Sequence, residues 1–242
     1  EAASTVKSFV QDKFTTLETA LNTSNVARAR HKEQKLVLEK LLGLEPAFRQ
    51  LVLLGEQGQE LVKVSRYVTR RSTERVASNL FLNENQERKY ISSIYIDEIT
   101  SEPMVTMGVP VTNVFGDVKG LVMAEVNLKF MWDLVDSIKI GKNGLAYVVD
   151  KEGNLIAFGD ISRVLKRDNL VHLPEVAEFV EGDEATHESS AGISKGILNT
   201  RVVSNHAHLG TPDWAVVVEL PVLEAYETVV NALILSAVVV FF

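Results

Sequence analysis

Tyr147-Val148-Val149-Asp150-Lys151-Glu152-Gly153 is the stretch that decides the fold, because the first half of the chain contains its counterpart. That counterpart is Val52-Leu53-Leu54-Gly55-Glu56-Gln57-Gly58, which matches it position by position. In both places an apolar run ends in polar turn residues and a glycine, and a second apolar run follows at Leu61–Val64 and at Leu155–Phe158. This pattern predicts a strand, a tight turn and a second strand. Its recurrence indicates two related units.

Outward from the first hairpin, the first half contains three more strand-like runs, at Ile91–Asp97, Met104–Val111 and Leu121–Val126. Gly116-Asp117 lies between the last two runs and predicts a turn that joins them into a hairpin. The residues between the first hairpin and these runs, 73–89, are polar and are expected to form a short helix and a loop.

The second half ends in a similar pair of runs, Arg201–His206 and Trp214–Glu219. The sequence therefore predicts two α+β units with antiparallel sheets, near residues 46–128 and 129–222. Phe130–Val135 is expected to form the short helix that joins them.

Residues 1–45 are expected to form a long N-terminal helix, which Gly43 and Pro46 end. The polar segment Asn22–Asn25 weakens the pattern. A narrow apolar stripe needs a partner along its length, and the partner is either a second copy of the chain or the chain's own domain. The stripe consists of Val6, Phe9, Val10, Phe14, Leu17 and Leu21, and then Leu36, Val37, Leu38, Leu41 and Leu42.

Residues 229–242 carry no charge and end on Val238-Val239-Val240-Phe241-Phe242. A helix needs about 20 apolar residues to span a bilayer. We therefore expect 223–242 to be an exit helix followed by the first part of a transmembrane helix, and a buried core helix is the alternative. An upstream transmembrane helix is also expected, because the sequence begins at Glu1 without a signal peptide.

The composition excludes several classes of function. A net charge of −7 and a pI near 5.3 disfavour a nucleic-acid partner. With no cysteine, the chain has no disulfide, no thiolate nucleophile and no Cys-ligated metal. No phosphate-binding glycine loop and no Gly-x-Ser-x-Gly elbow occurs, so no catalytic residue and no cofactor is predicted. His206 and His208 alternate along an expected strand and face the same side, but no metal site is predicted from them.

Several segments together resemble a double Cache sensor domain, a tandem of PAS-like modules found outside the membrane in bacterial and archaeal receptors. The resemblance implies a long N-terminal helix, two PAS-like sheets, a second membrane helix and a cytoplasmic output such as a histidine kinase, diguanylate cyclase or chemotaxis transducer. The segments are Val105–Val111, Gly116–Val122, Glu125–Leu128, Lys142–Ala157 and Trp214–Pro221.

In this family the ligand usually lies in the membrane-distal module, here the first. An amino-acid-binding subgroup uses an Arg-x-Trp-Tyr segment, a later Tyr and an Asp on the closing strand. Tyr95 matches the later Tyr, and Glu125 stands at the Asp position. The Arg-x-Trp-Tyr segment has no counterpart, because Glu87–Ile91 contains no Trp. The resemblance therefore implies ligand binding without implying an amino acid.

Four residues of the first module are the main candidates for ligand contacts. Glu125 can take a cationic group, and Tyr95 offers an apolar face and one hydroxyl. Thr106 adds a hydroxyl, and Arg66 an anion clamp. The alternatives are a core or rim aromatic for Tyr95, a solvated or lysine-paired carboxylate for Glu125 and a surface cation for Arg66.

Asp97 is the fifth candidate ligand contact. With Glu98 and Glu102 it offers the oxygen ligands that a hard cation prefers, and a solvated acidic loop is the alternative.

The sequence thus predicts an extracytoplasmic, ligand-sensing region of a protein in the cell membrane. A small ligand would favour one arrangement of the first module, and the exit helix would carry the shift into the bilayer. The expected partners are the small molecule, the membrane through the C-terminal helix and a second copy through the N-terminal helix. The alternatives are a membrane-tethered hydrolase and a structural spacer that binds nothing.

Overall fold

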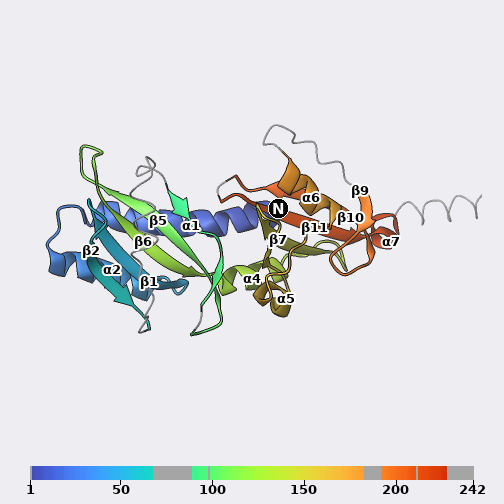
Figure 1. Cartoon of the computed structure of the whole chain (residues 1–242), viewed down its shortest axis with the longest axis horizontal. Helices are drawn as coiled ribbons and strands as arrows, with labels where there is room; N and C mark the ends of the chain where they lie inside the picture. Colours follow the sequence, from blue (N-terminus) through green and yellow to red (C-terminus); the bar gives the residue numbers. More distant parts are fainter. Residues whose placement is uncertain (1, 68–88, 98, 183–191, 211, 228–242) are drawn as a thin grey trace, which may run out of the picture. The chain divides into compact units, whose positions relative to one another are not determined.

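A computed structural model describes residues 2–67, 89–97, 99–182, 192–210 and 212–227 (Figure 1). The chain divides into two compact units. We call Ser8–Phe130 the N-terminal unit, and Met131–Phe242 with Glu1–Lys7 the C-terminal unit. The two units are described separately below.

The N-terminal helical region consists of two helices, α1 (Ala2–Thr23) and α2 (His31–Leu44). The expectation of one long helix over 1–45 is therefore corrected. The chain turns at Asn25, which has a φ of 45°, a left-handed conformation that Asn tolerates better than most residues. α2 then begins after Arg30, whose backbone N–H donates to Glu33 Oε2 over 3.0 Å.

The apolar stripe of α1 is buried within the chain itself. Lys13 Nζ pairs with Glu45 Oε2 at 2.9 Å and joins α1 to the end of α2. Lys89 Nζ pairs with Glu18 Oε1 at 3.0 Å and joins α1 to the start of the later strands. Of the two partners expected for the stripe, the chain's own domain occupies it. The buried stripe residues of α1 are Val6, Val10, Phe14, Leu17 and Leu21.

The N-terminal unit is built on a six-stranded antiparallel sheet in the order β2-β1-β6-β5-β3, with β4 paired to β5. The two predicted hairpins are present, and the predicted strand Ile91–Asp97 is two short strands that both pair with β5. The strands are β1 (Phe48–Gly55), β2 (Glu60–Ser65), β3 (Tyr90–Ile91), β4 (Tyr95–Ile96), β5 (Pro103–Thr112) and β6 (Val118–Asn127).

The C-terminal unit has a five-stranded antiparallel sheet in the order β8-β7-β11-β10-β9, so the predicted architectural repeat is confirmed. The predicted joining helix is α4 (Lys129–Asp136). The sequence did not predict the short helices α5 (Ile161–Leu165) and α6 (Pro174–Glu181), or the edge strand β9 (Gly192–Lys195). The other elements are β7 (Leu145–Asp150), β8 (Leu155–Ala157), β10 (Arg201–His208), β11 (Trp214–Pro221) and α7 (Val222–Ala225).

The two opening hairpins also share the geometry of their turns. Gly58 and Gly153 have φ values of 78° and 77°, a region that glycine enters at no steric cost. The Gly58 N–H donates to Gly55 O over 2.9 Å, and the Gly153 N–H donates to Asp150 O over the same distance. The match seen in the sequence is therefore a match of backbone conformation.

At the C-terminal end, β11 runs directly into α7. The predicted membrane segment, residues 229–242, and the helix and loop predicted for residues 73–88 lie outside the described residues. Within the part of the chain that the structure describes, no helix has the length and apolar character needed to cross a membrane.

Candidate functional site

The centre of the candidate site is Arg49, a charged residue in the fully buried strand β1. Only 3% of its surface is exposed. The pairing of β1 with β6 is irregular at this point, because Phe48 is opposite Val126 while Gln50 is opposite Glu125. A bulge of this kind redirects a side chain. A buried guanidinium is costly unless its charge and its donors are compensated.

One end of the Arg49 guanidinium is compensated. Its Nη1 lies 2.9 Å from Asp97 Oδ1 and donates to Thr100 Oγ1 over 3.0 Å. The guanidinium also lies over the Tyr67 ring, 5.3 Å from the ring centroid. These contacts tie β1 to the turn that follows β4.

The turn after β4 keeps Asp97 ionised. Asp97 Oδ1 accepts hydrogen bonds from the backbone N–H groups of Ile99 (2.9 Å) and Thr100 (2.8 Å). Burial acts to raise the pKa of Asp97, but the Thr100 amide, the Arg49 guanidinium and the Ile99 amide together hold it below its ordinary value. Arg49 therefore faces a carboxylate whose ionised form is favoured.

The other edge of the guanidinium has no such partner. Among the described residues, Arg49 Nε and Nη2 are buried and have no hydrogen-bond acceptor. These two nitrogens form one edge of the planar group, and their N–H bonds point in the same direction. An edge of this kind matches the two oxygens of a carboxylate. Buried donors without an acceptor are rare in native structures and call for an explanation.

Three further polar residues lie near Arg49, on the adjacent strands β1, β6 and β5. Gln50 on β1, Glu125 on β6 and Thr106 on β5 are cross-strand partners, and all three are buried. Tyr95 pairs with Met104, two residues before Thr106 on β5, and its hydroxyl is buried. The structure therefore places Thr106 and Glu125 side by side on neighbouring strands, with Tyr95 on the strand β4 beside them.

Arg66 has a structural role in the described chain. Its Nε donates to Phe48 O over 2.8 Å, and its Nη2 donates to Leu42 O and, over 3.3 Å, to Glu45 O. Leu42 and Glu45 lie at the C-terminal end of α2, where carbonyl groups lack partners within the helix. The guanidinium thus caps α2, and we do not retain it as the anion clamp.

Asp97 and Glu102, the described members of the acidic group, each have a partner within the chain. Asp97 is engaged by Arg49, and Glu102 Oε2 accepts a hydrogen bond from Asn127 Nδ2 over 2.8 Å. Glu98 lies outside the described residues. The contacts of Asp97 and Glu102 favour a structural turn over the hard-cation site considered from the sequence.

A separate groove of about 560 Å³ runs between α1 and α2. None of the five residues singled out from the sequence lines it. Thr16, Thr19, Leu36 and Leu44 contribute to its walls, and the last two are exposed apolar side chains.

Sequence reasoning missed Arg49, the residue that organises the site. The signal was present, because Phe48-Arg49-Gln50 directly precedes the apolar run Leu51–Leu54. Starting the strand at Leu51 left Arg49 outside it, whereas the structure extends β1 back to Phe48. A charged residue inside a fully buried strand is rare, and this makes Arg49 a candidate for the site.

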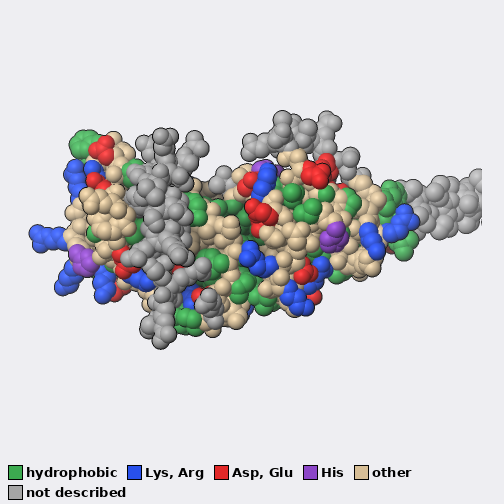
Figure 2. Space-filling view, in the orientation of Figure 1, with side chains coloured by type: hydrophobic (Ala, Val, Ile, Leu, Met, Phe, Trp, Pro, Cys, Tyr) green, Lys and Arg blue, Asp and Glu red, His purple; other side chains and the backbone are tan. Residues whose placement is uncertain are grey.

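Charges of both signs lie on the face of the molecule shown in Figure 2. On the face shown in Figure 2, the described Lys and Arg side chains are interspersed with Asp and Glu. With a net charge of −7, this distribution differs from the basic surface that binds phosphates.

Two tandem antiparallel sheets of the same strand order, with a buried polar site in the first, define a tandem PAS-like ligand-binding domain. The family model for the Cache domain, of the double-Cache type, matches residues 1–229. The chain therefore belongs to the Cache domain family and is a sensor domain.

Solved structures of Cache-type sensors have the same fold. The extracellular domain of the putative histidine kinase mmHK1S-Z2 is 15% identical, with a TM-score of 0.68 over 92% of this chain and 95% of that one. The ligand-binding domain of the Pseudomonas fluorescens chemoreceptor CtaA, in complex with L-serine, is 16% identical, with a TM-score of 0.63 over 91% and 92%.

A third structure is the ligand-binding domain of the Pseudomonas aeruginosa PAO1 amino-acid chemoreceptor PctC in complex with GABA. It is 18% identical, with a TM-score of 0.62 over 90% of this chain and 95% of that one. No curated protein matches the chain in sequence.

Proposed function

We propose that this chain is the extracytoplasmic sensor region of a membrane-bound signal-transduction protein, and that its N-terminal unit binds a small molecule that carries a carboxylate. Membership of the Cache family supports the sensor over the hydrolase considered from the sequence. We assign no catalytic activity to this region.

The observation that carries the proposal is the uncompensated edge of Arg49. Nε and Nη2 are buried donors without an acceptor among the described residues, while Nη1 is fixed by Asp97 and Thr100. A ligand carboxylate would supply to this edge two oxygen acceptors, which the described residues do not provide. The fixed end holds the guanidinium in place before the ligand arrives, which lowers the entropic cost of binding.

The rest of the ligand would contact the polar residues next to Arg49. We propose that Glu125 takes a cationic or hydrogen-bond-donating group, that Thr106 contributes its hydroxyl and that Tyr95 packs its ring against the ligand. The ligands named for the related structures, L-serine and GABA, carry both a carboxylate and an amine. These ligands support a site in which Arg49 binds a carboxylate and Glu125 an amine, although the Arg-x-Trp-Tyr segment of the amino-acid-binding subgroup is absent.

The proposed signal leaves through the C-terminal unit. Ligand binding would shift the population of conformations, and β11 would pass the change to α7 and the uncharged segment 229–242 in the membrane. We also propose that two copies pair through the α1–α2 region, where Leu36 and Leu44 leave apolar surface exposed. A histidine kinase, diguanylate cyclase or chemotaxis transducer would receive the signal.

A thermal-shift screen tests the proposed ligand class, because a ligand that binds only the folded state raises Tm by mass action. Four sets of compounds separate the possibilities: carboxylates without an amine, aminocarboxylates such as GABA and serine, amines without a carboxylate, and purines. We expect shifts only from compounds that carry a carboxylate. A shift from amines alone would contradict the role of Arg49. The absence of a shift from every set would favour the structural spacer.

A further inference from the structure

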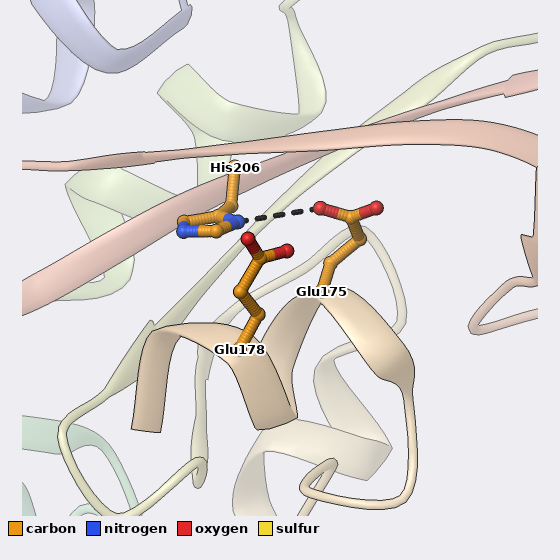
Figure 3. A group of neighbouring side chains, drawn as sticks. All are labelled: Glu175, Glu178 and His206. Atoms are coloured by element: carbon orange, nitrogen blue, oxygen red, sulfur yellow. Dashed lines mark hydrogen bonds and ion pairs between the residues drawn. The ribbon is translucent and has the colours of Figure 1, made fainter. Parts of the chain in front are cut away.

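The C-terminal unit contains a second polar cluster, formed by Glu175, Glu178 and His206 (Figure 3). The two glutamates lie three residues apart on α6 and therefore share one face of the helix. His206 comes from β10, on which α6 packs. One side-chain N or O atom from each of the three residues lies within 4.8 Å of the other two.

Glu175 is buried and held in a defined orientation. Only 5% of its surface is exposed. Its Oε1 accepts a hydrogen bond from Ser204 Oγ over 3.0 Å, and its Oε2 lies 3.2 Å from His206 Nδ1. Ser204 is itself 3.1 Å from Ser194 Oγ. Partners that orient a carboxylate in this way are typical of the residues that support metal ligands.

The cluster is short of positive charge. Among the described residues, no Lys or Arg forms an ion pair with Glu175 or Glu178, and the imidazole of His206 is the basic side chain in contact with Glu175. The negative charge of the cluster also acts on Glu219. Burial raises the pKa of Glu219, and the negative charge of Glu175 raises it further. A buried carboxylate without a permanent cation is normally paired or bound to a metal.

We propose that Glu175, Glu178 and His206 bind one divalent transition-metal ion of the zinc class. Zinc is bound by His nitrogen and carboxylate oxygen at about 2.0–2.2 Å in tetrahedral sites, which places two donor atoms roughly 3.3 Å apart. The 3.2 Å between Glu175 Oε2 and His206 Nδ1 already matches this separation. Glu178 is exposed and can close onto the ion from the solvent side. The imidazole favours this class over calcium or magnesium.

An ion in this place would join α6 to β10. β10 pairs along its length with β11, the strand that continues into α7. The metal site would thus stiffen the sheet next to α7. Its binding of a metal ion would not depend on the carboxylate site proposed at Arg49.

Calorimetric titration of the tag-free, chelator-treated chain with Zn²⁺ tests the proposal, with Ca²⁺ and Mg²⁺ in parallel. We expect one equivalent of Zn²⁺ to bind, and we expect Ca²⁺ and Mg²⁺ to bind far more weakly. Glu178→Gln is the first variant, because an exposed residue can be changed without disturbing the core. Its affinity for Zn²⁺ should fall about tenfold or more. His206→Asn should have the same effect.

The matched control is His208→Asn. His208 lies on the same strand as His206 and also contacts Phe179, but it is bonded to Asp213 at 2.6 Å and is outside the cluster. Its Zn²⁺ affinity should equal that of the wild type. A second measurement uses Co²⁺, whose visible absorption in the wild type should report tetrahedral coordination and should be lost in Glu178→Gln.

Three outcomes would overturn the proposal. The first is that the wild type takes up no Zn²⁺ in a saturable manner, which would leave the His206–Glu175 contact as a simple polar contact. The second is that Glu178→Gln and His206→Asn bind Zn²⁺ as tightly as the wild type. The third is that His208→Asn loses as much affinity as His206→Asn, which would indicate nonspecific binding to histidines.

Discussion

Two arginines of the N-terminal unit show how burial and partners decide the role of a residue. Arg66 donates hydrogen bonds to three backbone carbonyl groups, two of them at the end of α2, and therefore has a structural role. Arg49 is fixed at Nη1 and keeps one buried edge without a described acceptor. The residue type is the same in both cases, and the sequence alone singled out Arg66.

Arg66→Ala should destabilise the chain while leaving ligand binding unchanged. The substitution removes the donors of three backbone carbonyls, those of Phe48, Leu42 and Glu45. We expect a loss of about 1–2 kcal/mol in the free energy of unfolding, measured in urea. A loss of ligand affinity in the folded variant would contradict the capping role and would restore Arg66 as a ligand contact.

Asp97→Asn should produce a stability defect that depends on pH. The pKa of Asp97 is lowered in the folded state, so its charge stabilises the fold above the ordinary carboxyl range of about 3.9. This stabilisation is lost as the pH falls through the lower pKa of the folded state. The variant should therefore be less stable than the wild type by about 2 kcal/mol at pH 7, and the difference should shrink towards pH 3.

Urea unfolding of both proteins at the two pH values measures this difference. A defect of equal size at both values would show that Asp97 acts through its shape and not through its charge.

At this scale the sequence proposed Tyr95 and Glu125 through their match to the amino-acid-binding subgroup, Thr106 through its hydroxyl and Asp97 through its acidic neighbours. The structure brings Thr106 and Glu125 together as cross-strand partners. The sequence could not reveal the Arg49–Asp97 contact, because this ion pair joins residues far apart in the chain. The bulge that displaces Arg49 is set by the pairing of β1 with β6.

At the scale of elements, the recurring hairpin is the most informative feature. A short apolar run, ended by polar turn residues and a glycine that must adopt a positive φ, is a local signal and was readable in the sequence. The break between α1 and α2 was visible only as a weakening at Asn22–Asn25. The short elements α5, α6 and β9 were missed, because their stability comes from packing on the sheet and not from a long periodic pattern.

Gly153→Ala should cost more stability than Gly116→Ala, because both glycines have a positive φ but a Cβ at Gly116 would meet nothing within 4 Å. Both substitutions force a side chain into a left-handed conformation, at about 1–2 kcal/mol. A Cβ at Gly153 would also lie 2.4 Å from Val171 Cγ2 and 3.2 Å from Val176 Cγ1, at the start of α6. Unfolding in guanidinium chloride measures both variants, and equal losses would contradict the additional overlap.

The short helix α7 is tied to the segment before β7 by the side chain of Glu224. Glu224 in α7 accepts hydrogen bonds from the Lys142 amide and, at 3.0 and 3.1 Å, from the amide and side chain of Asn143. The Lys142 amide is the main cause of the lowered pKa of Glu224. α7 is therefore coupled to the segment that leads into β7.

Glu224→Ala should release this coupling and leave ligand binding intact. We expect faster hydrogen exchange at the amides of Lys142 and Asn143, because both lose their acceptor. Glu227→Ala is the matched control, since Glu227 contacts Lys142 only through the side-chain ammonium, at 3.2 Å. Unchanged exchange in Glu224→Ala would show that α7 is held by other contacts.

At the scale of the whole molecule, the chain combines two sheets of one strand order with different polar interiors. The N-terminal unit buries Arg49 together with Glu125, whereas the buried charged residues described in the C-terminal unit are the carboxylates Asp150, Glu175 and Glu219. On the two proposals above, the first unit would bind a ligand that carries a carboxylate, and the second would bind a metal cation.

The most direct test of the central claim is a calorimetric titration of the strongest carboxylate ligand from the screen into the wild type, Arg49→Lys and Arg66→Ala. Lysine keeps the charge beside Asp97 but lacks the planar edge. We predict that Arg49→Lys loses about tenfold to hundredfold in affinity, while Arg66→Ala retains the wild-type Kd. Wild-type affinity in a folded Arg49→Lys protein would contradict the assignment of the carboxylate site to Arg49.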